Sequence, residues 1–268
     1  MRLASADPSS WHLIGVDTNG ADGFSCEWPE YTNRPPADKK ICLVAVASDF
    51  FQDSAVIVSI AASGGHGLAL DRAGYVWCFG GNTHGQLGRQ LTGPAPRHFE
   101  YRPLKVLGVN NVVAIGAGNL HSLAVSRDGT VWAWGMNERG QLGDGTFINR
   151  YGPVQVTGLP SIQAAAGETE HSVFLGRDGS VWACGADFGG ALGIGGTTWR
   201  DWKRAVPVRV LNLSNVEAIA AGGQSSLAIC SDGSVWGWGN NARGELGINN
   251  PQEINAPLQV GTINVYNK

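Results

Sequence analysis

Four of the six histidines could supply chemistry, because an imidazole acts as a general base, a proton shuttle or a metal ligand near neutral pH. These four are His12, His66, His121 and His171. Each occupies the same place in a sequence pattern that recurs along the chain. A catalytic site instead needs several different groups that meet once. The recurrence therefore favours a structural role in packing and hydrogen bonding.

The best local cluster for a metal ion is Glu168-Thr169-Glu170-His171, because carboxylate oxygens and an imidazole nitrogen are suitable ligands. Adjacent residues on an extended strand point to opposite faces, however, so Glu170 and His171 would not converge on one ion. The five cysteines are widely spaced, without a C-x-x-C pair that would indicate a zinc or redox site. The sequence thus predicts no metal site and no cofactor.

Other catalytic patterns are also missing from the sequence. No serine, histidine and aspartate set can be assembled from spacing, and no G-x-x-x-x-G-K-[ST] loop exists to hold phosphates. We therefore predict no catalytic residues and a protein that is not an enzyme. The net charge of −3 provides no broad cationic field, which makes nucleic acid an unfavourable partner. The N-terminal segment lacks the apolar stretch of a signal peptide, so we expect an intracellular protein without a membrane partner.

Four plain copies of one repeat dominate the chain, which contains 39 glycines and only 15% charged residues. The first tryptophans of the copies lie 55, 50 and 54 residues apart, at Trp77, Trp132, Trp182 and Trp236. In the second copy, residues 121–125 and 131–134 resemble short strands, and Arg127-Asp128-Gly129 between them is a hairpin signal. Both faces of this hairpin are apolar, so each copy must be covered twice, as in a propeller or a solenoid.

A Gly-x-Leu-Gly element follows the second strand of each copy, at 85–88, 140–143, 190–193 and 244–247. Its glycines permit a tight turn while the leucine enters the core. Another glycine follows the tryptophan strand. We predict structural roles for the four tryptophans above, for Gly80, Gly135, Gly185 and Gly239, and for Leu87, Leu142, Leu192 and Leu246.

The combined pattern of H-S-x-A-L, D-G-x-V-W-x-W-G and N-x-x-G-Q-L-G resembles the regulator of chromosome condensation repeat. It covers roughly residues 55–262. Known members of that family are mostly seven-bladed propellers of four-stranded blades. The resemblance implies an all-β propeller that works by binding a partner.

The number of blades follows from extending the repeat in both directions. Residues 11–17 align with residues 65–71, which indicates a degenerate first copy. We expect one propeller domain over residues 1–268, with about five units at 1–54 (degenerate), 55–110, 111–160, 161–214 and 215–268. Five units either close a ring or form an incomplete arc that needs a partner to cover its last apolar face.

Two loops interrupt the repeat and carry aromatic and basic residues. Between Leu-Gly and Pro, the first copy has 14 residues and the third has 13, against nine in the other two. Long loops on a rigid scaffold are common binding elements, and Trp and Arg are enriched in binding hot spots. The alternative is that these aromatics only cap the propeller edge. The predicted partner-binding residues are Trp199, Arg200, Trp202, Lys203 and Arg204 in the third copy, and Arg97, Phe99, Tyr101 and Arg102 in the first.

These features favour a non-catalytic protein–protein interaction scaffold with a protein partner of unknown identity. The resemblance implies an alternative, guanine-nucleotide exchange on a small GTPase, which the founding family member performs. A third reading is a structural subunit of a larger assembly. The basic N-terminal tail linked with chromatin binding in the founding member is missing, since residues 1–38 contain only Arg2 and Arg34. We therefore expect a cytoplasmic rather than a nuclear protein.

Overall fold

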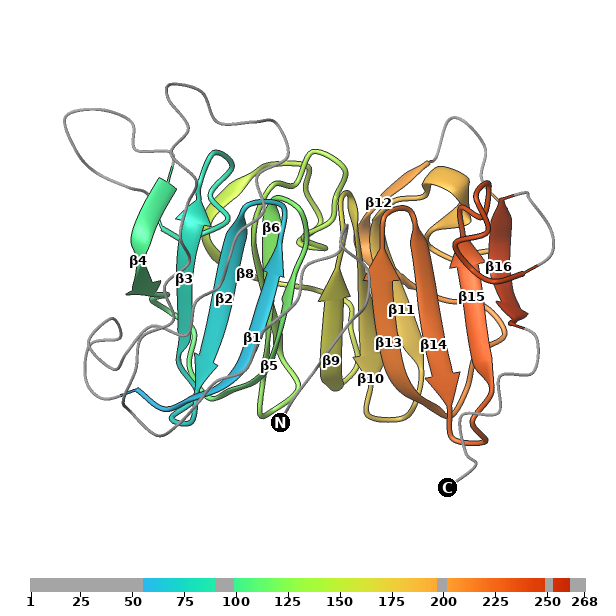
Figure 1. The fold of residues 1–268 in the computed structure, drawn as a ribbon, viewed down its shortest axis with the longest axis horizontal. Coiled ribbons are helices and arrows are strands. Elements are labelled where there is room, and N and C mark those ends of the chain that lie inside the picture. Colours follow the sequence, from blue (N-terminus) through green and yellow to red (C-terminus); the bar gives the residue numbers. More distant parts are fainter. Residues whose placement is uncertain (1–54, 90–98, 197–201, 249–252, 261–268) are drawn as a thin grey trace, which may run out of the picture. The chain divides into compact units, whose positions relative to one another are not determined.

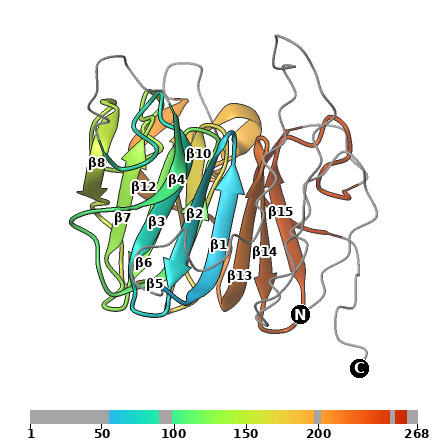
Figure 2. The same ribbon diagram turned by 60° about the vertical axis from the view of Figure 1, so that its left-hand side comes forward.

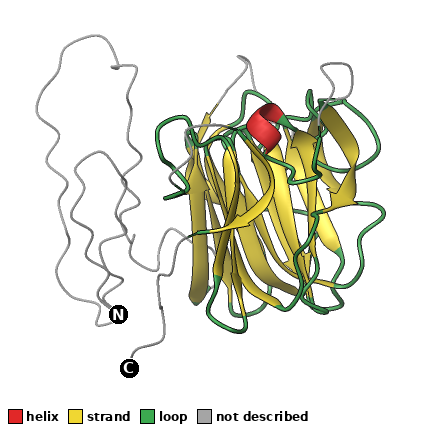
Figure 3. Cartoon of the chain, turned by 90° about the vertical axis from the view of Figure 1, so that its right-hand side faces the viewer, coloured by secondary structure: helices red, strands yellow, loops and turns green. Residues whose placement is uncertain are grey.

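A computed structural model of the protein describes residues 55–89, 99–196, 202–248 and 253–260. The strands all belong to one compact unit, Val56–Lys268. They form four antiparallel sheets of four strands, accompanied within the described ranges by one short 3₁₀ helix (Figures 1 and 3). No helix in this part of the chain is long and apolar enough to cross a membrane.

Each sheet is built from four strands that follow one another in the chain, so neighbours in sequence are neighbours in space. The first sheet contains β1 (Ile57–Ser63), β2 (His66–Asp71), β3 (Val76–Gly81) and β4 (Phe99–Lys105). The second contains β5 (Val112–Ala117), β6 (His121–Ser126), β7 (Val131–Gly135) and β8 (Arg150–Gln155).

The other two sheets repeat this order. The third contains β9 (Ile162–Gly167), β10 (His171–Gly176), β11 (Val181–Ala186) and β12 (Lys203–Arg209), with the helix η1 (Phe188–Gly190) after β11. The fourth contains β13 (Val216–Gly222), β14 (Ser225–Cys230), β15 (Val235–Gly239) and β16 (Ile254–Gln259).

The hairpin between β6 and β7 shows how the repeat sequence produces its sheet. Gly129 adopts φ +90° in the turn, and the main-chain N–H of Ser126 donates to the carbonyl of Thr130 at 2.8 Å. The resulting register places Ala124 opposite Trp132 and therefore puts both on one face of the sheet. Leu123 and Val125 lie on the other face. Each hairpin thus presents one aromatic face and one aliphatic face.

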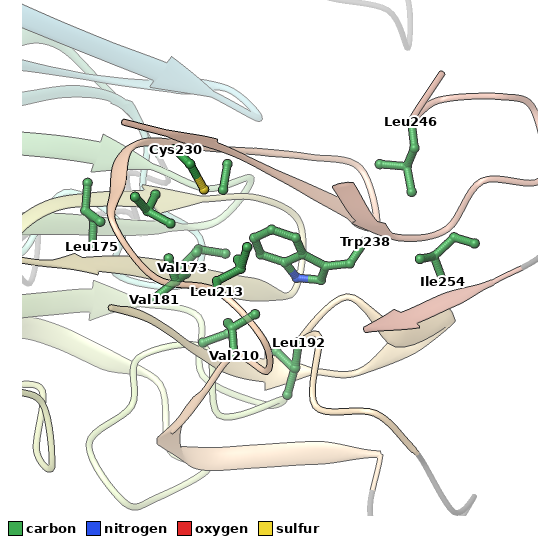
Figure 4. Packing of buried hydrophobic residues seen from close by; sticks show 13 residues of the cluster. Val173, Leu175, Val181, Leu192, Val210, Leu213, Cys230, Trp238, Leu246 and Ile254 are labelled. Atoms are coloured by element: carbon green, nitrogen blue, oxygen red, sulfur yellow. The ribbon is translucent and has the colours of Figure 1, made fainter. Parts of the chain in front are cut away.

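The sheets stack in chain order (Figures 1 and 2). The aliphatic face of one packs against the aromatic face of the next. β5 packs against β1 and β2, β9 against β5 and β6, and β13 against β9 and β10. Figure 4 shows the core between the third and fourth sheets, where Trp238 of the fourth sheet lies among Val173, Val181 and Leu192 of the third. The expected propeller architecture is confirmed. The degenerate unit expected over residues 1–54 lies outside the described residues.

The aliphatic face of the fourth sheet differs from its counterparts. Leu123 and Val173, in the second and third sheets, are fully buried by the sheet that follows. Leu227, at the same repeat position of β14, is only half-buried, and Ala220 beside it on β13 is exposed. Among the described residues no sheet covers this last aliphatic face, and its side chains are exposed or half-buried.

Candidate functional site

The repeated histidines are buried and connect consecutive sheets. The imidazole Nε2 and serine Oγ atoms lie 2.9, 2.8 and 3.0 Å apart in His66–Ser122, His121–Ser172 and His171–Ser226. In the first pair, the serine hydroxyl donates its proton to the carbonyl of Gln86, in the Gly-x-Leu-Gly element of the preceding sheet. The serine therefore accepts from the imidazole, which must carry its hydrogen on Nε2.

Burial fixes the charge state of these histidines. Desolvation lowers the pKa of His66 and His171 to about 4 and that of His121 to about 3. The three imidazoles are neutral at pH 7, and the Nε2 atom of each is hydrogen-bonded to a serine. They hold adjacent sheets together rather than present a base or a metal ligand to solvent.

The residues predicted as structural lie in the sheets or in the turns that follow them. The four leucines are buried, Trp77 is buried, and Trp132, Trp182 and Trp236 are half-buried. Gly80 has φ +97°, while Gly135, Gly185 and Gly239 each have φ +105°. A Cβ on Gly135 would lie 2.5 Å from the carbonyl oxygen of Leu120, so both conformation and space require glycine there.

The predicted binding residues of the first loop fall into two groups. Arg97 lies outside the described residues, whereas Phe99, Tyr101 and Arg102 are exposed on β4, at the edge of the first sheet. The Phe99 and Tyr101 rings meet edge to face at 5.2 Å. At the equivalent point of β8, the main chain of Tyr151 lies against Gly85 of the preceding sheet, while its side chain is 47% exposed. No such element precedes Tyr101 among the described residues, and its side chain is 81% exposed.

The third-copy loop contributes a more organised arrangement. Trp199 and Arg200 lie outside the described residues, but Trp202 immediately precedes β12 and Lys203 is the first residue of that strand. The Trp202 ring stacks on Phe188 of η1, with centroids 4.7 Å apart. On the second sheet's side, the guanidinium of Arg139 lies 4.9 Å from the Trp202 centroid. The Trp202 ring thus contacts both an aromatic ring and a cation.

Two further side chains extend this arrangement. The Lys203 ammonium lies 4.2 Å from the centroid of Phe147, in the loop before β8, and 5.6 Å from that of Trp202. Arg139 Nε lies 3.3 Å from Oε1 of Glu170. We call Trp202, Phe188, Arg139, Glu170, Lys203 and Phe147 the Trp202 cluster.

The stacking of the sheets explains why these residues meet. A Cβ on Gly140 would lie 2.7 Å from the Cα of Ala205, so the Gly-x-Leu-Gly element of the second sheet closely approaches β12 of the third. Arg139 immediately precedes this glycine and therefore lies next to Trp202. Arg204 is adjacent; its guanidinium donates to the carbonyl of Lys203 at 3.2 Å. The predicted residues Trp202, Lys203 and Arg204 therefore lie together, apart from the β4 group.

Arg139, Phe147 and Phe188 were not predicted from the sequence, and Glu170 was considered there only as a metal ligand. Each stands at a position that varies between copies: Phe188, for example, replaces Thr83, Glu138 or Ala242 between the Asn and the first Gly of the element. Variation at one repeat position was the available signal. The stacking of the sheets decides which variable positions of two copies lie close together, and the sequence of a single copy does not reveal that stacking.

Asp187 lies beneath the cluster at a position where the other copies have asparagine. Its Oδ1 accepts from the main-chain N–H of Leu192 at 2.9 Å, and its own N–H donates to the carbonyl of Trp202 at 2.6 Å. Burial raises the pKa of the carboxyl to about 6. Asp187 thus ties the main chain of Trp202 to the Gly-x-Leu-Gly turn of its own sheet.

Comparison with known proteins agrees with the repeat architecture. Residues 13–267 match the family model of the RCC1-like domain. The chain belongs to the RCC1-like domain family. The structure of yeast RCC1 (Prp20) bound to Kap60 matches with a TM-score of 0.67 and 25% identity, over 79% of this chain and 50% of that one. Human WBSCR16 matches with a TM-score of 0.68 at 22% identity, over 76% and 51%.

Relatives by sequence carry other names. The probable E3 ubiquitin-protein ligase HERC6 of Homo sapiens is 35% identical over 205 residues, which are 74% of this chain and 14% of that protein. The ultraviolet-B receptor UVR8 of Arabidopsis thaliana is 26% identical over 268 residues, 97% and 58%. The chain spans less than two thirds of the length of either relative and about half that of the solved structures.

Proposed function

We propose that this RCC1-like protein is a non-catalytic scaffold that binds a protein partner through the Trp202 cluster. The observation that carries the proposal is the pairing of cations with rings at a junction of two sheets: Arg139 over Trp202, and Lys203 over Phe147. These residues interrupt the repeat instead of forming it. Held by the sheets on both sides, they lose little conformational entropy when a partner binds, which favours affinity.

The surroundings of the cluster define the chemistry of the partner. Phe147 is 44% exposed and the adjacent Ile148 is 61% exposed, so an apolar anchor of the partner has a place to pack. Glu170 neutralises Arg139, whereas Lys203 has no carboxylate within ion-pair distance in the described part of the chain. A partner surface that combines an apolar side chain with acidic groups fits this arrangement.

Exchange of guanine nucleotide on a small GTPase remains a second candidate function. It is supported by relatives alone: the crystal structure of Prp20p from Saccharomyces cerevisiae was determined together with its binding properties to Gsp1p and histones. That structure is 24% identical and therefore informs on the fold. The Trp202 cluster provides no residue-level argument for exchange.

The test is a double substitution, Phe147→Ala with Lys203→Ala, compared with Phe99→Ala with Tyr101→Ala. Phe147, Phe99 and Tyr101 are exposed and Lys203 is half-buried, all near the starts of outer strands, so both variants should melt close to the parent protein. Hot-spot truncations commonly cost about 2 kcal/mol or more, so the cluster variant should bind its partner at least about tenfold more weakly. Affinity capture from source cells with quantitative mass spectrometry identifies the partner, and titration with the purified partner measures the loss.

Three results decide between the candidates. Loss of binding in the cluster variant alone supports the proposal. Loss in the β4 control variant alone moves the binding surface to the first sheet and overturns it. If a small GTPase is captured, nucleotide release should be measured with both variants, and catalysed release would favour the exchange function over the scaffold.

A further inference from the structure

The first tryptophan of each repeat has an indole N–H that must find an acceptor when its ring is packed between sheets. In three copies the acceptor lies within the same hairpin. Trp77 donates to Asp71 Oδ2 at 2.9 Å, Trp182 to Ser180 Oγ at 3.0 Å, and Trp236 to Ser234 Oγ at 2.9 Å. These bonds close the hairpin and leave the indole unavailable to a ligand.

Trp132 in the second copy departs from this pattern. Thr130 stands at the position of Ser180 and Ser234, and the Trp132 Nε1–H has no acceptor among the described residues. The side chain is half-buried and lies in the wall of a groove of about 460 Å³. The indole N–H of this copy alone is left to water or to a ligand.

The groove lies between the connection from β4 to β5 and the hairpin turn from β6 to β7. Asn110 and Asn111 line one side, and Arg127, Asp128 and Thr130 line the other. At the position of Asn110 the third copy has Pro160 and the fourth has Ser214, so among these three copies only the second has an amide side chain there. The turn lies at the opposite end of β7 from the loop that leads to Phe147, so this groove is separate from the Trp202 cluster.

The polar groups of the groove offer both a donor and an acceptor. The Trp132 indole provides an uncommitted N–H. Asp128 accepts the main-chain N–H of Thr130 through Oδ1 at 2.9 Å, and its exposed carboxylate has lone pairs for a further donor. Hydrogen bonds from Thr130 lower the pKa of Asp128, which keeps it an acceptor at neutral pH. One donor and one acceptor beside a flat ring match the two hydrogen-bonding groups of a peptide unit.

We propose that this groove is a second binding site, which takes an extended peptide segment by pairing a main-chain carbonyl with the Trp132 indole N–H and a main-chain N–H with Asp128. The Trp132 ring supplies the apolar contact. Asp128 disfavours a carboxylate ligand through like-charge repulsion, whereas Arg127 favours one. The probes must therefore distinguish binding of a neutral peptide from binding of an anion.

The experiment monitors the indole N–H signals of the ¹⁵N-labelled protein by NMR, with assignments from Trp132→Phe, Trp182→Phe and Trp236→Phe. The probes are the blocked tripeptide acetyl-Ala-Ala-Ala-amide and acetate, each titrated into the millimolar range. We expect the tripeptide to shift the Trp132 signal saturably while those of Trp182 and Trp236 stay in place, and acetate to shift none of them. Equal shifts of all three signals, no shift of Trp132, or an equal effect of acetate would each overturn the proposal.

Two substitutions test the role of the indole N–H while keeping an aromatic ring at position 132. Thr130→Ser recreates the serine acceptor of the third and fourth copies, so it should bind the indole internally, slow the exchange of its hydrogen and weaken tripeptide binding several-fold. Trp132→Phe should weaken binding by a similar factor, because one hydrogen bond contributes about 1 kcal/mol. Trp182→Phe is the matched control and should bind the tripeptide as the parent does. Unchanged binding in both second-copy variants would show that the indole N–H is not part of the site.

Discussion

The third and fourth sheets share topology, turn residues and the tryptophan position, yet their aliphatic faces meet different surroundings. Val173 in β10 is fully buried beneath the fourth sheet, whereas Leu227 at the same position of β14 is half-buried. His171 reaches across to Ser226, but the fourth copy has Ser225 in place of the histidine, and its hydroxyl donates to Gly222 of its own sheet. Within the described residues, the fourth copy therefore lacks the histidine–serine bond that would join it to a following sheet.

We expect the stability of a blade to come largely from its neighbours. A hairpin with two apolar faces satisfies its own main chain but covers neither face. In a repeat protein, stability is approximately the sum of unit terms and nearest-neighbour interface terms. The fourth sheet has one described interface and the second and third have two, so the same substitution should have different effects in different copies.

The largest expected effect is acid destabilisation, which arises in the three histidine-linked interfaces. Each imidazole has a pKa of about 3 to 4 in the folded protein, compared with about 6.5 when exposed. The unfolded chain therefore binds more protons below pH 6.5, and stability is full above that value and falls as the pH approaches 4. At pH 5 each histidine should cost about 2 kcal/mol, on the order of 6 kcal/mol in total. Asp187, with a raised pKa of about 6, acts in the opposite direction.

Urea unfolding at pH 5, 6 and 7 measures this loss. His121→Gln should reduce the pH dependence by roughly a third. Ser225→His is the matched comparison: a histidine on the accessible face keeps a nearly normal pKa and should add no acid sensitivity. If Ser225→His increased the acid sensitivity as much as His121→Gln reduces it, the aliphatic face of the fourth sheet would have to be covered like those of the other sheets.

Much of this architecture could be predicted from the sequence, because its signals are local. The Asp-Gly turns, the alternation around Trp132 and the Gly-x-Leu-Gly elements each specify one hairpin or turn. Their repetition indicates stacked sheets, and the resemblance of the pattern to the RCC1 repeat implies the propeller. The contact from His121 to Ser172 could not be predicted, since it joins residues of different copies. The same holds for Arg139 and Trp202, which meet only because one sheet's turn packs on the next sheet's outer strand.

A smaller effect is expected from truncating matched leucines in the two kinds of face. Leu123 and Leu227 occupy the same repeat position, the first fully buried and the second half-buried. Leu123→Ala should cost about 3 kcal/mol, because it leaves a cavity between two sheets. Leu227→Ala should cost about 1 kcal/mol, since water can fill the space. Denaturant midpoints at equal slope measure both, and similar losses would show that another part of the protein covers the fourth face in solution.

The smallest effect separates two adjacent serines, Ser225 and Ser226, which differ only in the face they occupy. Ser226 is 1% exposed, accepts the imidazole N–H of His171 and donates to the carbonyl of Ala191 at 3.3 Å. In Ser226→Ala that carbonyl keeps the indole N–H of Trp238 at 2.9 Å, but His171 loses its acceptor inside the core. The cost should be about 2 kcal/mol, the usual penalty for a buried unsatisfied donor.

Ser225→Ala is the matched change on the accessible face. Its hydroxyl bonds to Gly222 where water can replace it, so the cost should stay below about 0.5 kcal/mol. The two variants have the same composition and differ by one position in β14, so propensity and unfolded-state effects largely cancel. If Ser225→Ala were as destabilising as Ser226→Ala, the hydroxyl of Ser225 would have to be buried, and the distinction between the two faces of the fourth sheet would fail.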